Sequence, residues 1–300
     1  MSTVAEARAT TRRVARTFSL ACRLLPADVR DDVYLLYLVF RTLDDLVDEE
    51  RAEAPERLAA VEAWAAGEAA PRTPDVEVLD GLAARHPIPR AALAEFCEGM
   101  RWDLERRAFR TEAQLDAYCY RVAGTVGIVM ASVLGTVDDA RARPAAAALG
   151  MAMQRTNILR DLDEDGAAGR TYLARETTDR FGTPVPGARE ALLRDQIAKA
   201  DARYDEGIAG IALLRRGRGA VRAAAWMYRE ILRQLEREGL GVRAGRACVS
   251  GPRKLWVGVR RGFALPRGGV AAPRPVSRIA AGHMPAPHQI SAAPTSPHAD

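Results

Sequence analysis

The chain has 300 residues, of which 48% are hydrophobic, so it is long enough to bury a sizeable core in one or two domains. The net charge is +5, but residues 251–300 carry +6 and the first 250 residues carry −1. This uneven distribution removes the main argument for nucleic-acid binding by the body of the protein, and we expect no nucleic-acid partner.

The sequence predicts neither secretion nor a membrane span. The N-terminus lacks the apolar core of a signal peptide, and the longest apolar-rich segment, residues 122–137, is shorter than the roughly 20 residues of a spanning helix. The four cysteines lie far apart and form no C-x-x-C pair, so we expect reduced, mostly buried thiols. No histidine and cysteine cluster has the spacing of a zinc site. We therefore expect a cytoplasmic protein.

Long proline-free runs with helical periodicity, rich in alanine, leucine and arginine, predict an all-α protein. The spacing predicts helices at about 5–22, 27–51, 56–66, 75–85, 89–107, 112–137, 144–165, 187–216 and 219–239. Asp28 and Thr111 are expected near helix starts. We find no alternating strand pattern and no repeat of fixed period.

The helix predicted at 27–51 carries an unusual polar face. Its members are Tyr37, Arg41, Asp44, Asp45 and Asp48, whose steps of four, three, one and three place them on one side of a helix. The other sides of this helix are apolar, which predicts a central position. Clustered carboxylates on a central helix require a counter-charge, and a divalent cation is the natural one.

A second polar face is predicted near the end of the helix at 144–165. Gln154, Asn157, Asp161 and Asp165 are spaced three, four and four, after an apolar run. One D-x-x-x-D pair alone is usually a solvated acidic face. Two such pairs on apolar helices favour a site where several Mg²⁺ ions bridge a diphosphate and make it a good leaving group.

Two further segments leave alternatives open. Gly124 and Gly127 interrupt an apolar helix, which indicates either a bend beside a cavity or close helix packing, and spacing alone does not separate the two. Arg170 follows the second acidic pair and could hold phosphate oxygens, although a solvated loop arginine is the simpler interpretation of the spacing.

The C-terminal region changes in character. Residues 263–300 are rich in proline, alanine and arginine, and we expect disorder after about residue 265 and a catalytic domain over 1–262. Its arginines offer the alternative of weak docking to an anionic membrane surface, with a solvated tail favoured.

Together these segments resemble the squalene/phytoene synthase family, and are closest to its bacterial phytoene synthase-like members. The resemblance spans about residues 8–260. The matching pieces are Thr17-Phe18-Ser19, the Tyr37/Arg41/DDLVD segment, Gly99-Met100 with Asp103-Leu104, YCYRVAGTVG at 118–127, QRTNILRDLDED at 154–165, Arg170, Tyr172, and the late helix from Tyr228.

The resemblance implies a single-domain helical fold of the isoprenoid-synthase type with a central cavity. It implies metal ligands at Asp44, Asp48, Asn157, Asp161 and Asp165, which would bind Mg²⁺ and diphosphate. It implies catalytic contacts from the four aspartates with Tyr37, Arg41 and Tyr172. It implies substrate contacts from Phe18, Ser19, Val122, Gly124, Gln154, Arg160, Arg170 and Tyr228.

The implied reaction joins two prenyl diphosphates head to head, foremost geranylgeranyl diphosphate to phytoene through a cyclopropyl diphosphate. The chain has no dinucleotide fingerprint, so no NADPH is expected. Open alternatives are a C30 product from farnesyl diphosphate through presqualene diphosphate, prenyl transfer to a small aromatic acceptor, and a non-catalytic lipid-binding protein. A monomer or homodimer, with or without peripheral contact at the inner membrane face, fits this reading.

Two departures from the family pattern stand out. Ala15 occupies a position where many relatives have a short polar residue, which puts one diphosphate contact in doubt. Ala174 replaces the proline of the common R-x-Y-L-P pattern.

Overall fold

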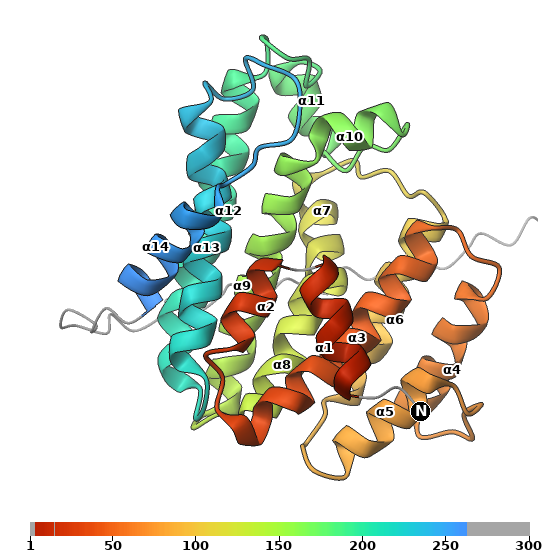
Figure 1. The fold of residues 1–300 in the computed structure, drawn as a ribbon. Helices are drawn as coiled ribbons and strands as arrows, with labels where there is room; N and C mark the ends of the chain where they lie inside the picture. The colour runs from red at the N-terminus through yellow and green to blue at the C-terminus, as the bar shows by residue number, and fades with distance from the viewer. Residues whose placement is uncertain (1–3, 15, 263–300) are drawn as a thin grey trace, which may run out of the picture.

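The computed structural model describes residues 4–14 and 16–262, and within these ranges it contains helices but no strand (Figure 1). An isolated bridge joins Thr136 to Leu214. The elements are α1 Val4–Val14, α2 Arg16–Cys22, α3 Ala27–Asp48, α4 Ala54–Ala66, α5 Pro74–Ala83, α6 Arg90–Leu104, α7 Glu112–Cys119, the π-helix η1 Tyr120–Gly124, α8 Thr125–Leu134, α9 Asp139–Arg160, α10 Leu162–Ala167, α11 Arg175–Phe181, α12 Glu190–Gly210, the 3-10 helix η2 Ile211–Leu213, α13 Arg218–Arg237 and α14 Gly251–Gly262.

Helix α9 is the centre of the bundle. It packs against α12, α13, α8 and η1, while α3 packs against α1, α6 and α8 on the other side (Figure 1). One main hydrophobic core connects these helices, because each buries an apolar face against its neighbours. The all-α prediction is therefore confirmed. The proposed boundary at residue 262 stays a prediction, because residues 263–300 lie outside the described ranges.

The single helix predicted at 112–137 is wrong in detail. It begins as expected after Thr111, whose Oγ1 accepts a hydrogen bond from the backbone N–H of Gln114 at 3.3 Å. It then widens into a π-helix at Tyr120–Gly124 and ends at Leu134, before Gly135 with a φ of 71°. Within the described ranges, Glu112–Leu134 is also the one helical stretch long and apolar enough to cross a membrane, contrary to our expectation of none. Half of its apolar window is buried, as expected of a core helix.

The helix predicted at 144–165 differs at both ends. Helix α9 begins at Asp139, where the Asp138 carboxylate accepts a hydrogen bond from the Arg141 backbone N–H at 3.2 Å. Pro144 therefore lies inside the helix instead of starting it. The helix ends at Arg160, and α10 begins after Asp161.

Other boundaries also differ from the sequence prediction. The expected helix at 5–22 is described as two helices, α1 and α2, on either side of residue 15. Residue 15, where the departure Ala15 from the family pattern falls, lies outside the described residues. Helix α3 begins at Ala27, so Asp28 lies in its first turn and not at its cap. Helices α11 and α14 were not predicted. Three of the four cysteines are buried, as predicted, and Cys248 is exposed.

Candidate active site

A cavity of about 780 Å³ lies among α2, α3, α8, α9 and α13. Along α9 its lining changes from Ala142 and Ala146 through Leu149 to Asn157 and Arg160, so polarity rises toward the end of the helix. The cavity lining becomes more polar in the same way as the chain runs into and along α3, from Leu25 and Val33 to Tyr37 and Arg41. The C-terminal ends of α3 and α9 point to the same end of the bundle (Figure 1). The cavity is thus apolar in its depth and polar beside the two acidic motifs, the arrangement required by an amphiphile with an anionic head.

The first acidic motif lies in the last turn of α3. Arg41 donates from Nη1 to Oδ2 of Asp44 at 3.1 Å and also pairs with Asp45. Asp44 keeps 40% of its side chain exposed and lies one helical turn beyond Arg41, which lines the cavity; Asp44 itself is outside that lining. Burial and then the charge of Asp48 raise the pKa of Asp44 to about 7. A helix C-terminus is the negative end of the helix dipole, so three carboxylates there leave this end of α3 short of positive charge even with Arg41 beside them.

The second acidic motif crosses the break between α9 and α10. The backbone N–H of Asp161 donates to the Asn157 carbonyl at 2.9 Å, and that of Asp165 to the Asp161 carbonyl at 2.8 Å, so the helical spacing survives the break. Arg160 and Arg246 both pair with Asp161. Burial and then the charge of Asp161 raise the pKa of Asp165 to about 6.

Arg170 connects the two motifs. Its backbone N–H donates to the Asp165 carbonyl at 2.8 Å, and its guanidinium donates from Nη1 to Oδ1 of Asp48 at 3.2 Å. The side chain is only 19% exposed, so it is not the solvated loop arginine that spacing alone favoured. The two acidic motifs, separated by more than a hundred residues in sequence, therefore meet at Arg170, whose charge also partly offsets the raised pKa of Asp165.

A further carboxylate, Asp103 on α6, was not assigned a role from the sequence. It accepts hydrogen bonds from the Tyr118 hydroxyl at 2.9 Å and the Tyr172 hydroxyl at 3.2 Å. Burial raises its pKa to about 6, with a further contribution from Asp48, although both tyrosine hydrogen bonds lower it. No helical spacing connects these three residues, so only the fold brings them together.

The other expected substrate residues divide into two groups. Those lining the cavity are Phe18, Tyr37, Arg41, Val122, Gln154, Asn157, Arg160 and Tyr228. Phe18 stacks on Tyr37 with ring centroids 4.6 Å apart, and the Tyr228 hydroxyl donates to Oδ1 of Asn157 at 3.2 Å. Ser19 and Gly124 are outside this lining: Ser19 is buried and hydrogen-bonded to Tyr34.

Gly124, the last residue of η1, and Gly127, in the first turn of α8, both serve close packing. A Cβ on Gly124 would lie 3.0 Å from the Tyr120 ring and 3.4 Å from the Ala147 carbonyl oxygen. A Cβ on Gly127 would overlap the backbone of Ala146, and Gly127 also lines the cavity. The packing interpretation therefore holds at both glycines, and Gly127 also borders the cavity.

Sequence reasoning also missed three cavity cations, Arg13, Arg246 and Lys254, which lie in segments without any recognisable motif. Ala174, where relatives have proline, has φ −64° and ψ 140°. Proline itself takes this φ, so the substitution keeps the backbone path after Tyr172.

The donor set fits divalent cations that arrive with a diphosphate. In the described part of the chain no three acidic, histidine or cysteine side chains form a ready metal cage. Mg²⁺ does not need one, because it commonly takes one or two carboxylates together with phosphate oxygens and water. Nε of Arg41 is buried and has no hydrogen-bond partner among the described residues. An unpaired donor beside under-neutralised carboxylates is suited to a bound anion and its metal ions.

The sequence of residues 11–253 matches the family Squalene/phytoene synthase. The chain belongs to this family. A phytoene synthase from Thermus thermophilus is 40% identical over 276 residues, covering 86% of this chain and 91% of that protein. A 15-cis-phytoene synthase from Synechococcus elongatus is 34% identical over 277 residues, covering 83% and 89%.

Solved structures agree with this assignment. A dehydrosqualene synthase in complex with ligand superposes with a TM-score of 0.78 at 28% identity, covering 86% of this chain and 94% of that one. A squalene synthase from Alicyclobacillus acidocaldarius superposes with a TM-score of 0.69 at 26% identity, covering 79% and 94%. The expected isoprenoid-synthase type of fold is therefore confirmed.

Proposed function

We propose that the chain is a prenyltransferase that condenses two molecules of geranylgeranyl diphosphate head to head into phytoene. The observation that carries the proposal is the cavity, which is apolar in its depth and opens beside two acidic motifs connected by Arg170. The similarity to phytoene synthases over most of the chain supports the same reaction.

The polar end of the cavity would hold the diphosphates. Arg41 offers its unpaired Nε, and Arg160 and Arg246 also line this end. Arginine suits this role because its planar fork can donate two hydrogen bonds to phosphate oxygens. These cations would fix the head groups and leave the isoprenoid chains to the apolar lining.

Divalent metal ions complete the site, and we propose Mg²⁺. Asp44 and Asp48 on one side, and Asn157, Asp161 and Asp165 on the other, would hold the ions. When bound, the ions would stabilise the negative charge that develops on the leaving diphosphate. The raised pKa values of Asp44 and Asp165 support this assignment, since both carboxylates lack full neutralisation by protein groups.

In the proposed reaction, the C–O bond to one diphosphate breaks and leaves an allylic cation with inorganic pyrophosphate. The double bond of the second substrate attacks this cation, and proton loss gives a cyclopropyl diphosphate. That diphosphate ionises in turn, the skeleton rearranges, and a second proton loss gives the triene. The stacked rings of Phe18 and Tyr37 face the cavity and can stabilise cationic carbon through their π-systems. Burial raises the pKa of Tyr37, so its phenol stays neutral.

A second candidate keeps the site and changes the substrate. The superposition on a dehydrosqualene synthase favours condensation of two C15 diphosphates into a C30 product. The two candidates differ in the chain length that the cavity accepts, and not in the acidic motifs.

The test is product analysis by mass spectrometry. Purified full-length protein is incubated with Mg²⁺ and either geranylgeranyl or farnesyl diphosphate, with and without NADPH. The proposal predicts a C40 triene from the first substrate, unchanged by NADPH. A C30 product from farnesyl diphosphate alone would replace the proposal by the second candidate. Absence of any coupled product, with pyrophosphate released only when a small aromatic acceptor is added, would overturn both.

A further inference from the structure

Helix α14, which no sequence motif predicted, has one face tightly packed on α13. Val257 is buried at this contact. A Cβ on Gly258 would lie 3.1 Å from Sδ of Met227, and one on Gly262 would lie 2.9 Å from Cβ of Ala223. The two glycines therefore let the helices approach closely and fix which side of α14 faces outward.

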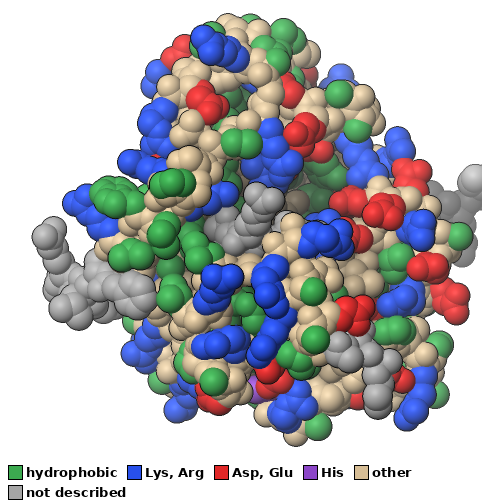
Figure 2. Space-filling model, viewed as in Figure 1, with side chains coloured by type: hydrophobic (Ala, Val, Ile, Leu, Met, Phe, Trp, Pro, Cys, Tyr) green, Lys and Arg blue, Asp and Glu red, His purple; other side chains and the backbone are tan. Residues whose placement is uncertain are grey.

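The outward side carries three large apolar residues. Leu255, Trp256 and Val259 are 52%, 50% and 55% exposed. The remaining large exposed hydrophobic residues of the described chain are single positions elsewhere: Leu24, Val137, Val185 and Val242. Hydrophobic side chains gather over α14 at the left of the molecule in Figure 2, with basic side chains beside them. A contiguous apolar patch on one exposed helix indicates an interaction surface.

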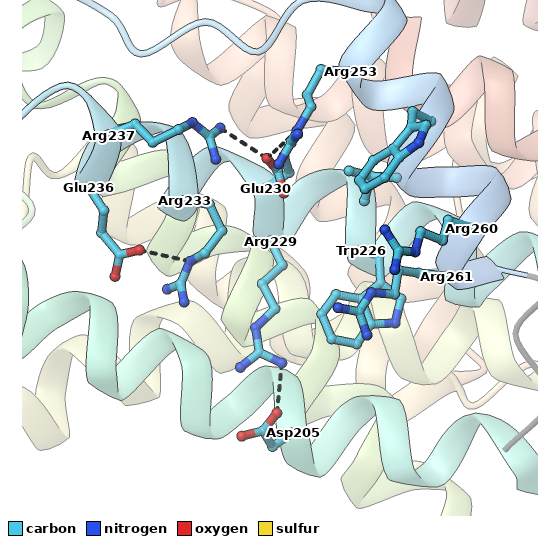
Figure 3. Close-up of a pocket in the computed structure, with 12 residues that line it drawn as sticks. Asp205, Trp226, Arg229, Glu230, Arg233, Glu236, Arg237, Arg253, Arg260 and Arg261 are labelled. Carbon is cyan, nitrogen blue, oxygen red and sulfur yellow. Dashed lines mark hydrogen bonds and ion pairs between the residues drawn. The ribbon is translucent and has the colours of Figure 1, made fainter. Parts of the chain in front are cut away.

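The patch borders a basic groove of about 820 Å³ between α13 and α14 (Figure 3). Arg237 and Arg253 share Glu230, at 2.9 and 2.8 Å. Arg260 stacks on Trp256 at 5.0 Å and Arg261 on Trp226 at 4.9 Å. Neither of these two arginines has a carboxylate partner among the described residues, so the groove carries uncompensated positive charge beside the apolar patch.

We propose that this surface, formed by the outer face of α14 and its basic groove, docks on an anionic phospholipid bilayer. The apolar side chains would enter the boundary between head groups and acyl chains, and the indole of Trp256 would lie at that boundary. Arg260 and Arg261 would contact the anionic head groups, each strengthening binding by about fivefold. Charge complementarity selects this occupant, because a neutral partner would gain nothing from the arginines.

The surface adjoins the cavity. Residues 246–249 and Lys254, in the first turn of α14, line the cavity, while Leu255 and Trp256 follow directly on the outer face. A bilayer on this face would therefore lie beside one wall of the cavity. The importance of a bilayer beside the cavity rests on the proposed function, since a hydrocarbon product needs an apolar destination. The docking itself does not rest on that function.

The experiment is vesicle flotation of the full-length protein with phosphatidylcholine alone and with increasing phosphatidylglycerol. We expect binding that grows with anionic lipid and falls with salt. Arg260→Gln with Arg261→Gln should weaken binding by roughly 30-fold. Leu255→Ser with Val259→Ser should weaken it by about tenfold or more. Brominated lipid should quench tryptophan fluorescence in the parent protein, and this quenching should disappear in Trp256→Phe.

Matched controls separate this surface from other sources of binding. Arg141→Gln with Arg143→Gln removes the same two positive charges elsewhere. Val137→Ser with Val185→Ser removes two exposed apolar side chains elsewhere. Both variants should bind like the parent. Loss of binding in Arg267→Gln/Arg274→Gln/Arg278→Gln, with the α14 variants unaffected, would overturn the proposal and assign binding to the tail. Absence of vesicle binding would also overturn the proposal. A larger mass by light scattering that the α14 variants abolish, without lipid binding, would overturn it too, because it would indicate contact with a second copy of the chain.

Prenyltransferase activity in detergent separates this proposal from the proposed function. The α14 variants should retain this activity within about twofold, since none of the five substituted positions lines the cavity. Vesicle binding without any prenyltransferase activity would leave the docking surface standing and remove the function.

Discussion

Two clusters of arginine and carboxylate in this protein differ in how completely their charges are paired. One surrounds Arg155, where α7, α9 and α12 meet. The other surrounds Arg41 and Arg170 at the polar end of the cavity. Both contain closely spaced acids, so composition alone would not distinguish them.

The Arg155 cluster is complete. Arg155 is 3% exposed and donates to Asp116 at 2.9 Å, to Gln196 at 3.0 Å and to Glu112 at 2.8 Å. Burial alone would raise the pKa of Glu112, but the hydrogen bond from Thr177 and the charge of Arg155 outweigh it and lower the pKa. Each member therefore stabilises the others in their charged forms.

The Arg41 cluster is incomplete. Nε of Arg41 is buried without a partner among the described residues, and the pKa of Asp44 is raised to about 7 by burial and by Asp48. The contrast teaches that a buried ion cluster with all groups paired supports the fold, whereas one short of positive charge and with a spare donor is prepared for a ligand.

The largest effect that tests this contrast is expected from Asp44→Asn. Turnover should fall by roughly 10²–10³-fold, because a ligand to the charge-stabilising metal is lost. The melting temperature should stay unchanged or rise, because a like-charge repulsion is removed. Steady-state kinetics and thermal melts measure both. Glu49→Gln, which makes the same charge change on the exposed residue after α3, is the control and should remain active; equal losses in both variants would contradict the metal assignment.

The converse change is Arg155→Met. It leaves Glu112 and Asp116 without their counter-charge, and the free energy of unfolding should fall by about 3–5 kcal/mol. Denaturant titration measures this loss, and Arg155→Lys should recover part of it. The fraction that remains folded should turn over substrate at a rate close to that of the parent. A large drop in turnover with unchanged stability would place Arg155 in the chemistry instead.

A smaller and more specific effect is expected from Arg41→Lys. The positive charge is kept but the guanidinium fork and its unpaired Nε are lost, so kcat/KM should fall by about 10- to 100-fold. Stability should change little, since Asp44 and Asp45 keep a cation nearby. Unchanged kcat/KM would show that the spare donor has no part in diphosphate binding.

The smallest effect concerns pH. The folded-state pKa of Glu112 lies below its ordinary value of 4.5, so its contribution to stability is present above that value and is lost as pH falls through the folded-state pKa. Glu112→Gln should therefore be less stable than the parent at pH 7 by about 1–2 kcal/mol. The difference should shrink in the acid range. A constant difference at all pH values, measured by urea titration, would show that its charge is not the stabilising feature.

The sequence predicted much of the polar site because helical spacing is local. The face from Tyr37 to Asp48 and the step from Asn157 to Asp161 follow from the period of 3.6, and the structure places both beside one cavity. The break at Asp161 was not predicted, because the hydrogen bonds that bridge it preserve the same spacing.

Features that depend on distant segments could not be predicted. The Asp103, Tyr118 and Tyr172 cluster joins three elements through side chains alone. Arg170 was interpreted as a solvated loop arginine because its partner Asp48 lies on the distant helix α3. Helix α14 was missed because it is rich in arginine, like the tail that follows it. Its glycines show their packing role only in the structure, where they lie against α13.

The most direct test of the central claim is calorimetric titration of the full-length protein with an uncleavable thiodiphosphate analogue of the substrate, with and without Mg²⁺. We expect tight binding that requires Mg²⁺ and is weakened in both Asp44→Asn and Asp161→Asn, because both motifs would contact one metal–diphosphate assembly. Binding that is equally strong without Mg²⁺, or that neither variant weakens, would contradict it.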